Sequence, residues 1–402
     1  MYDTEVAIVG AGAAGLSLAY RLSAEKPGGR LGPEVTLVDA PPGPLRPPER
    51  TWCFWEEPGG EYDDVLTASW DRLRVRGPAG EEITGTTAPL RYKMLRSGDF
   101  EAEVGRRLGR SPFLRPVSAR VTEVAALGQG AEVRGTGADG EPLRLRARWV
   151  FDSRPPRGLP PARTTLLQHF RGWFLRAERP VFDPGTADLM DFRTPQPAHG
   201  LSFGYVLPTS PYEALVEYTE FSRSVLTPEG YERALRHYTR EVLGVDRYEV
   251  TGTEQGVIPM TDGRYPRQAA PAVFRIGTAG GATRPSTGYT FAAVQRQTRA
   301  IAAAYHQGRT PLPPPPHSPW SRAMDAVLLR ALDSGRVDGA AFFTGLFRRV
   351  PAERLLRFLD GRTRIPEDLA IGLRTPVGPM LRTAVEVPWL RRRPSPAGNG
   401  DP

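Results

Sequence analysis

The sequence predicts an α/β protein in which a discontinuous, Rossmann-like nucleotide-binding domain carries an inserted, mostly antiparallel β-sheet domain and is followed by C-terminal helices. Three observations support this fold class. A glycine motif follows the first apolar run, a second glycine-rich segment follows a later apolar run at 272–276, and four strand-like runs separated by proline and glycine lie between them. A chain of 402 residues also exceeds the usual limit for a single hydrophobic core.

The N-terminal motif is typical of a dinucleotide-binding unit. The apolar run at 4–9 leads into GAGAAG at 10–15, which has the pattern G-x-G-x-x-G, and a second apolar run at 35–38 ends in an acid. The first glycine permits a tight turn, the second lets a pyrophosphate approach, and the third lets the helix pack on the strand, while the acid can accept from a ribose hydroxyl. A loop insertion at 27–30 accounts for the long gap before the acid. We therefore expect cofactor contacts from Gly10, Gly12, Ala13, Ala14, Gly15 and Asp39.

The second glycine-rich segment has the sequence GTAGGATRPSTGYTF at 277–291. Its glycines let the backbone approach a bulky ligand closely. A strand that ends in glycine and leads into a helix presents free N–H groups and a positive dipole end to an anion, and a threonine can hydrogen-bond a ribityl hydroxyl. Beside the N-terminal motif, this segment predicts a flavin, FAD, held between the two, in a fold of the flavin hydroxylase and reductase type. The contacts expected here are Gly277, Thr278, Gly280 and Gly281.

Between these motifs, the pattern predicts a helix at 97–108 with Ser97 as a possible cap, and a β-meander at 114–145 with turns at 128–130 and 138–140. Strands are expected at 166–176, 189–193, 201–208, 213–219 and 248–259, with a helical stretch at 222–243 that Thr227 caps. The predicted domains are a FAD-binding domain at 1–155 and 250–310, a substrate-binding sheet at 156–249, a helical region at 311–390 behind a proline run, and a disordered tail at 391–402.

Composition excludes several classes of function. The net charge is +8, but the cations are almost all scattered arginines, so we expect no nucleic-acid partner and favour attraction to an anionic membrane surface. The single cysteine, Cys53, excludes an intramolecular disulfide and fits a reducing cytoplasm. The start of the chain lacks a signal-peptide pattern, and no apolar stretch is long enough to span a bilayer. One cysteine and five dispersed histidines give no metal-ligand spacing, so no metal is expected.

Glu217 is the candidate catalytic residue. It lies in an otherwise apolar and aromatic strand at 214–220. The pattern alone is equally consistent with a carboxylate exposed to water and with one facing an apolar cavity. In a cavity, desolvation would favour the protonated form and make it a competent acid. Glu220 points to the opposite face and is the weaker candidate, and His169 is expected to be a hydrogen-bonded histidine of the sheet.

Together these segments resemble the lycopene β-cyclase family of carotenoid biosynthesis in its bacterial form, over roughly residues 4 to 360. The resemblance rests on GAGAAG at 10–15, RTWCFW at 50–55, FDSRP at 151–155, LLQHFRGW at 166–173, MDFR at 190–193, LSFGYVLP at 201–208, VEYTEFS at 216–222, GVIPM at 256–260 and the 277–291 segment.

The resemblance implies a redox-neutral isomerisation of lycopene or a related linear carotene, with reduced FAD as cofactor and NAD(P)H as its reductant. An acid protonates the terminal double bond of the ψ end, the tertiary cation is attacked by the next double bond, and loss of a proton gives the β-ionone ring. The family's essential acid matches Glu217, whereas the second acid of the plant form is Tyr218 here. Trp52, Trp55, Phe203 and Tyr205 were candidates for aromatic faces around the cation. Because lycopene lies in the bilayer, the resemblance implies a cytoplasmic, peripherally membrane-associated enzyme.

Two alternatives remain open from the sequence. A FAD-dependent monooxygenase or reductase acting on a polyprenoid would have the same fold, but it would consume NAD(P)H stoichiometrically. A non-catalytic carotenoid- or flavin-binding module would keep its biological output after Glu217→Gln, whereas a cyclase would lose it.

Overall fold

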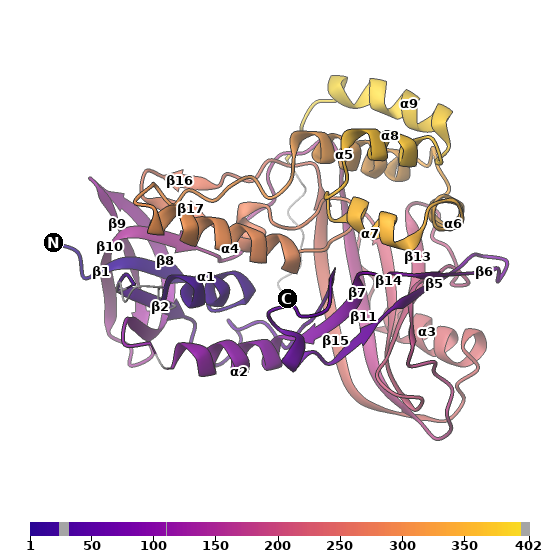
Figure 1. The fold of residues 1–402 in the computed structure, drawn as a ribbon, viewed down its shortest axis with the longest axis horizontal. Helices are drawn as coiled ribbons and strands as arrows, with labels where there is room; N and C mark the ends of the chain where they lie inside the picture. The colour runs from indigo at the N-terminus through magenta and orange to yellow at the C-terminus, as the bar shows by residue number, and fades with distance from the viewer. Residues whose placement is uncertain (24–31, 110, 395–402) are drawn as a thin grey trace.

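A computed structural model of the chain describes residues 1–23, 32–109 and 111–394 (Figure 1). Within these residues the strands form two seven-stranded sheets and one three-stranded sheet. The predicted loop insertion at 27–30 lies outside the described residues. The first sheet and the second sheet lie at opposite ends of the molecule, and the helices that follow residue 318 lie over the second (Figure 1).

The first sheet has a parallel centre in the spatial order β8, β2, β1, β10, β17. Its strands are β1 (Thr4–Val9), β2 (Val35–Asp39), β8 (Leu114–Leu127), β9 (Gly130–Gly137), β10 (Pro142–Asp152), β16 (Gln268–Ala270) and β17 (Val273–Arg275). The apolar side chains of β1 alternate between two cores, because successive residues of a strand point to opposite faces. Both faces of this sheet are therefore covered, as a parallel centre requires.

One face of the first sheet packs against α1 (Ala13–Ser23), α2 (Ser97–Leu108) and α4 (Phe291–His306). The other face is covered by the antiparallel meander of β8, β9 and β10. The predicted meander and its two turns are confirmed, and Gly128 and Gly140 adopt positive φ in those turns.

The second sheet runs β15, β11, β14, β13, β12, β5, β6. Its strands are β5 (Arg72–Arg76), β6 (Glu82–Thr86), β11 (Thr165–Ala177), β12 (Thr186–Asp191), β13 (Leu201–Pro208), β14 (Glu213–Ser222) and β15 (Tyr248–Thr261). All neighbours are antiparallel except β12 and β5, so the predicted mostly antiparallel character is confirmed. Its outer face packs on α3 (Pro228–His237), and its inner face contributes to a core shared with the C-terminal helices.

A small sheet joins the two lobes. It consists of β3 (Thr51–Glu56), β4 (Ala68–Trp70) and β7 (Arg91–Arg96). Trp52 and Phe54 of β3 pack on Phe291 of α4, with ring centroids 5.4 Å and 4.7 Å apart. The alternate residue Trp55 instead packs on Tyr92, in the core of the second sheet. Because successive side chains of β3 point to opposite sides, this one strand contributes to both cores.

The C-terminal helices are α5 (Pro319–Asp333), α6 (Gly339–Arg349), α7 (Ala352–Leu359), α8 (Ile365–Gly372) and α9 (Val377–Glu386), followed by the short turn η4 (Val387–Trp389). All five helices lie within the range 311–390 that was expected to be helical. Apolar side chains from α5 to α7 are buried in the core beneath the second sheet.

The strand pairings differ from the predicted domain ranges at two places, although the division into domains itself remains a prediction. β15 pairs with β11 along its whole length, so residues 250–261 belong to the second sheet and not to the returning nucleotide-binding segment. β5 and β6 come from the predicted first domain, yet they form the far edge of the second sheet.

Three smaller predictions were wrong. Ser97 does not cap α2; it lies within the helix, and its Oγ accepts from the backbone N–H of Arg50. The helical stretch predicted from 222 begins only at Pro228, where Thr227 does cap it by accepting from the Gly230 N–H. The predicted disordered tail begins too early, because Arg393 exchanges two backbone hydrogen bonds with Ala162; residues 395–402 lie outside the described residues.

Candidate functional site

The N-terminal glycine motif has the geometry that a dinucleotide cradle requires. Gly10 has φ of +94°, in the left-handed region that favours glycine. A Cβ on Gly15 would stand 1.8 Å from the Gly10 carbonyl oxygen, so α1 packs directly on the turn. At Gly12, by contrast, no heavy atom in the described part of the chain lies within 4 Å of the Cβ position, which leaves space for a ligand.

Asp39 stabilises this turn at the end of β2. One carboxylate oxygen accepts from the Ala11 N–H at 3.0 Å, and the other accepts from Arg46 Nε at 2.9 Å. The paired carboxylate raises the pKa of the Arg46 guanidinium. The Arg46 side chain is 47% exposed, so a ribose hydroxyl can compete for this carboxylate without displacing a buried group.

The second glycine-rich segment lies against the first. Gly277 has φ of +63°, and a Cβ there would stand 2.9 Å from the Ala14 Cβ. Gly281 also has positive φ, and Thr278 is exposed. β17 leads into a short 3-10 turn, η3 (Gly277–Gly280), and α4 begins at Phe291, where the glycine-rich segment ends. Anion-binding N–H groups at this segment would therefore come from a single turn.

Two buried polar atoms beside this segment have no hydrogen-bond partner among the described residues. They are Oγ1 of Thr287 and Oε1 of Gln168. Between them Gly288 adopts φ of +74°, and a Cβ there would stand 2.3 Å from the Gln168 oxygen. Buried polar groups are normally paired, so this arrangement fits a polar ring system such as an isoalloxazine. Together with the open side of Gly12, it makes the two segments compatible with FAD.

Glu217 faces the interior of the molecule. It lies on β14 with only 6% of its surface exposed, which excludes the alternative of a water-facing strand carboxylate. The strand pairings place four residues in one row across the inner face: Tyr205 on β13, Glu217 on β14, Gly172 on β11 and Glu254 on β15. Burial first, and then the neighbouring Glu254 carboxyl, raise the pKa of Glu217 well above its usual range.

Gly172 makes the meeting of the two carboxyls possible. A Cβ at this position would stand 2.8 Å from Cγ and 3.3 Å from Oε1 of Glu217. On the same face of β11, Phe170 lies over Gly256 and Phe174 lies over Gly252, so two phenyl rings flank the gap. The carboxyl pair therefore occupies a niche bordered by aromatic rings.

Glu254 is a residue that the sequence analysis missed. Its carboxylate accepts from Thr51 Oγ1 of β3 at 2.6 Å, and burial raises its pKa. The signal in the sequence was weak: Glu254 alternates with Gly252 and Gly256 in a predicted strand. Nothing in the sequence indicated that this strand pairs with β11 opposite Glu217.

A chain of tyrosines connects the row to the glycine-rich segment. The Tyr92 hydroxyl lies 2.6 Å from that of Tyr205 and 2.8 Å from that of Tyr289. Burial raises the pKa of all three phenols, and it raises the pKa of the adjacent Cys53 thiol to about 12. These groups are therefore neutral hydrogen-bonding groups at physiological pH.

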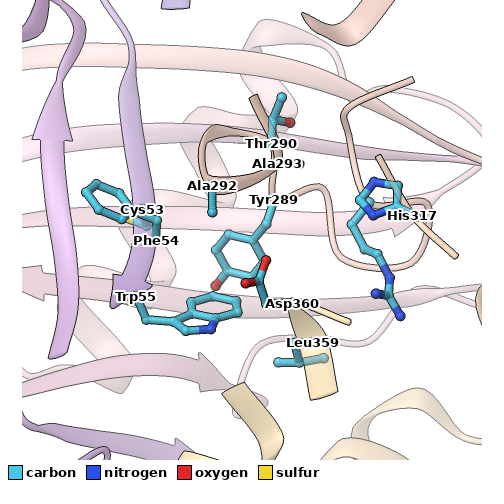
Figure 2. A pocket seen from close by; sticks show the side chains of 11 residues that line it. Cys53, Phe54, Trp55, Tyr289, Thr290, Ala292, Ala293, His317, Leu359 and Asp360 are labelled. Atoms are coloured by element: carbon cyan, nitrogen blue, oxygen red, sulfur yellow. The ribbon is translucent and has the colours of Figure 1, made fainter. Parts of the chain in front are cut away.

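Figure 2 shows the pocket on the other side of Tyr289. The ring of Trp55 from β3 meets the edge of Tyr289, with centroids 4.6 Å apart, while Leu359 and Asp360 at the end of α7 and His317 complete the wall. The Trp55 Nε1 is buried without a hydrogen-bond partner in the described part of the chain. Tyr289 and Trp55 thus form an aromatic wall of this pocket.

The four aromatic candidates divide into two pairs. Trp55 and Tyr205 lie in the network beside Glu217. Trp52 packs on Phe291 in the core of the first lobe, and Phe203 is buried in the core of the second. The expectation for Trp52 and Phe203 is therefore not supported by their positions, because both are committed to core packing.

The outer face of β14 carries a separate polar cluster. His169 is fully buried between the Tyr231 hydroxyl, at 2.6 Å, and Ser222 Oγ, at 2.8 Å, and burial lowers its pKa to about 4. Its predicted structural role is confirmed. Tyr218, at the position of the plant form's second acid, points to this face and donates to Glu220 at 2.8 Å. The carboxyl partner of Glu217 is Glu254 and not a neighbour in sequence.

Residues 1–23, 32–109 and 111–394 contain no group of three or more His, Cys, Asp or Glu side chains placed to hold a metal ion. Over the same residues, no helix has the length and apolar character needed to cross a bilayer.

Comparisons with known proteins agree on a flavoprotein fold. A family model described as "Lycopene cyclase protein" matches residues 5–385. A search of curated protein sequences gave no significant match.

Among solved structures, a geranylgeranyl bacteriochlorophyll reductase-like protein from Thermoplasma acidophilum is similar with a TM-score of 0.60 and 11% identity, over 94% of this chain and 98% of that one. The p-nitrophenol 4-monooxygenase PnpA from Pseudomonas putida DLL-E4 has a TM-score of 0.60 and 15% identity, over 97% and 98%. The flavin-dependent monooxygenase PieE, solved with FAD and substrate, has a TM-score of 0.60 and 16% identity, over 100% of this chain and 77% of that one. The chain thus has the fold of FAD-dependent monooxygenases and reductases, and the predicted fold class is confirmed.

Proposed function

Because this chain belongs to the lycopene cyclase family, we propose that it is a lycopene β-cyclase, which closes the ψ end groups of lycopene into β-ionone rings without net redox change. The observation that carries the proposal is the buried Glu217 carboxyl, whose pKa is raised well above its usual range by burial and by Glu254. Such a carboxyl keeps its proton at neutral pH and can give it to a hydrocarbon.

In the proposed reaction, Glu217 transfers its proton to the terminal double bond of the carotene. The tertiary cation is then attacked by the next double bond of the same chain, and a proton is lost from the new ring. The Phe174 ring already carries the Arg96 guanidinium, 4.2 Å from its centroid. The acid, the Phe170 ring and the indole of Trp55 remain to form an electron-rich surface. Such a surface favours a carbocation, because aromatic faces carry negative potential.

FAD is the cofactor that we assign to the two glycine segments. Gly10, Gly12, Ala13, Ala14 and Gly15 would hold its pyrophosphate, Asp39 its ribose, and the segment with Gly277, Thr278, Gly280 and Gly281 its ribityl and ring portion. In its reduced form, produced by NAD(P)H, FAD would supply negative charge that stabilises a nearby cation.

The decisive experiment is co-expression of the chain in a lycopene-accumulating host, with the pigments separated by chromatography. We expect ring-bearing carotenes with the native chain. Glu217→Gln should leave lycopene unchanged while the purified protein retains its flavin. The matched control is Glu220→Gln, a buried glutamate on the opposite face of the same strand, which should still give cyclised products. Unchanged lycopene with a soluble, flavin-loaded native protein would refute the proposal, and cyclised products from Glu217→Gln would remove Glu217 from it.

The fold itself favours one alternative, a FAD-dependent monooxygenase or reductase acting on a polyprenoid. The ratio of NAD(P)H consumed to product formed separates the two. A cyclase needs reductant only to keep its flavin reduced, whereas an oxygenase or reductase consumes one equivalent for each product.

We also propose that α8, α9 and η4 bind the protein to the membrane in which its substrate lies. Exposed apolar side chains recur at four-residue spacing along these elements, which places them on one side. On α8 these are Ile365, Leu369 and Leu373, with Leu373 70% exposed; on α9 and η4 they are Leu381, Val385 and Trp389, with Trp389 84% exposed.

Exposed arginines accompany this apolar face and suit anionic headgroups; they include Arg364, Arg374, Arg382 and Arg391. Co-sedimentation with vesicles that contain an anionic lipid tests the proposal. The double variant Leu381→Asp, Val385→Asp should lose binding. Val225→Asp, at an exposed apolar residue that precedes α3 in the chain, should not. α3 lies away from α8 and α9 (Figure 1). Equal binding by all three proteins would contradict the assignment of this face.

A further inference from the structure

We infer that Glu254 is a positioning residue of the acid site: it carries the negative charge of a two-carboxyl pair and thereby holds the proton on Glu217. The inference rests on the proposed function in that Glu217 is taken as the acid. The pairing of the two carboxyls itself is independent of the substrate.

The row across the sheet brings the two carboxyls together from strands that are not neighbours. Glu217 and Glu254 both pair with Gly172, from opposite sides of β11. A Cβ at position 172 would stand 2.8 Å from the Glu217 Cγ, so the glycine leaves room for the Glu217 side chain over β11. After burial, the neighbouring Glu254 carboxyl is what raises the pKa of Glu217.

The surroundings of the two carboxyls differ in a way that decides where the proton resides. Glu254 accepts from Thr51 at 2.6 Å, it is partly exposed, and the Arg96 guanidinium favours its charged form. Glu217 is buried, and in the described part of the chain no cation forms an ion pair with it. A carboxylate is stabilised by donors, solvent and positive charge, so Glu254 is the ionised member and Glu217 the protonated one.

The other titratable groups around Glu217 do not alter this balance. Tyr205 from β13, Tyr289 from the loop before α4 and Cys53 from β3 face the same site, and burial raises the pKa of each, so they are neutral. On the Glu254 side, Arg96 from β7 and Glu49 oppose each other's influence. The pair therefore holds one proton between two carboxyls at neutral pH.

A paired site of this kind also accounts for recovery of the acid. When Glu217 gives its proton to the carotene, two carboxylates remain side by side in a nearly dry niche. Their repulsion favours the return of a proton, and ring closure releases one from the product cation. One proton leaves the pair and one comes back, so no net proton or electron is consumed.

The test measures the pair directly, by infrared spectroscopy of the protonated carboxyl band during a pH titration of the purified protein. The native chain should keep a buried protonated carboxyl at neutral pH, absent in Glu217→Gln. In Glu254→Gln the charge is gone and the new amide can donate to Glu217, so the titration midpoint should fall by about one pH unit or more. Glu220→Gln is the matched control and should leave the midpoint unchanged.

Cyclisation with reduced FAD, followed over the same pH range, is the second readout. Glu254→Gln should retain activity at acidic pH and lose it at a lower pH than the native chain, while Glu254→Asp should restore part of the native profile. A midpoint in Glu254→Gln that equals or exceeds the native one, by either readout, would overturn the inference. If the native chain shows the infrared shift but no cyclisation, the proposed function fails and the carboxyl pair stands.

Discussion

Gly172 is paired with Glu217 across the β11–β14 ladder, and a Cβ at position 172 would stand 2.8 Å from the Glu217 Cγ. We expect Gly172→Ala to turn the acid away from its place and to lower kcat by about 100-fold, because a shift of about 1 Å in a reacting group has an effect of that order. Gly252→Ala on β15, where the Cβ would stand 3.3 Å from a Phe174 ring carbon, is the control and should keep most activity. Near-native turnover in Gly172→Ala, measured at equal flavin content, would contradict this account of the row.

The two glycines Gly12 and Gly15 should respond differently to alanine. At Gly12 there is open space, so Gly12→Ala should fold with a native melting temperature but bind FAD more weakly, because its methyl group occupies the place of the pyrophosphate. At Gly15 a Cβ would stand 1.8 Å from the Gly10 carbonyl oxygen, so Gly15→Ala should be destabilised by about 1–3 kcal/mol or more. Thermal unfolding without flavin, followed by flavin titration, separates the two effects. Equal loss of stability in both variants would argue against the assigned roles.

Glu217→Gln should become more stable than the native chain as pH rises. In the unfolded chain this carboxyl loses its proton near its usual pKa of 4.5, whereas the folded protein keeps it because burial and Glu254 raise the pKa. The folded state therefore binds more protons between pH 4.5 and the raised pKa, and native stability falls there by about 1.4 kcal/mol per pH unit. Denaturant unfolding should show that the free energy of unfolding of Glu217→Gln, relative to that of the native chain, is higher at pH 8 than at pH 5. A difference in free energy of unfolding that does not change with pH would mean that Glu217 is ionised in the folded protein.

The ion pair of Arg284 and Asp325 should be a large contributor to stability. Both side chains are at most 4% exposed, Arg284 Nε lies 2.8 Å from the carboxylate, and Ser286 donates to the same carboxylate at 2.7 Å. Asp325→Ala leaves a buried guanidinium without its partner, and we expect a loss of about 3–5 kcal/mol. The exposed pair Arg247 and Glu178 is the control, and Glu178→Gln should change stability by less than about 1 kcal/mol. Urea unfolding curves for the two variants provide the comparison.

Much of the first lobe could be predicted from the sequence because its signals are local. The G-x-G-x-x-G pattern determines a turn within six residues, and the extent of α2 follows from apolar spacing. The sequence alone did not determine whether the Glu217 side chain is buried. Its strand was clear, but which face of the strand is inward depends on the helices and on β3, which are remote in sequence.

The pairing of remote segments had no such local signal. No strand was predicted at 72–86, and nothing in these residues indicates that β5 adds to β12 more than 100 positions later. Glu254 was missed for the same reason, because its partner lies across Gly172 and on a third strand. The Ser97 cap failed because the hydroxyl found a competing partner, the N–H of Arg50, which tertiary structure alone provides.

The second sheet draws its two outer edges from beyond the inserted segment, β15 from the chain that follows it and β5 with β6 from the chain that precedes it. The second sheet can therefore not be transferred to another protein as the inserted segment alone. In a chimera that takes residues 156–249 from a related enzyme, the inner strands of the sheet would come from that enzyme, whereas the edge strands β15, β5 and β6 would remain those of the host. Glu217 and Glu254 would then come from two different proteins. Exchange of substrate preference between relatives by recombination therefore requires crossovers that carry 72–86 and 248–261 together with the graft.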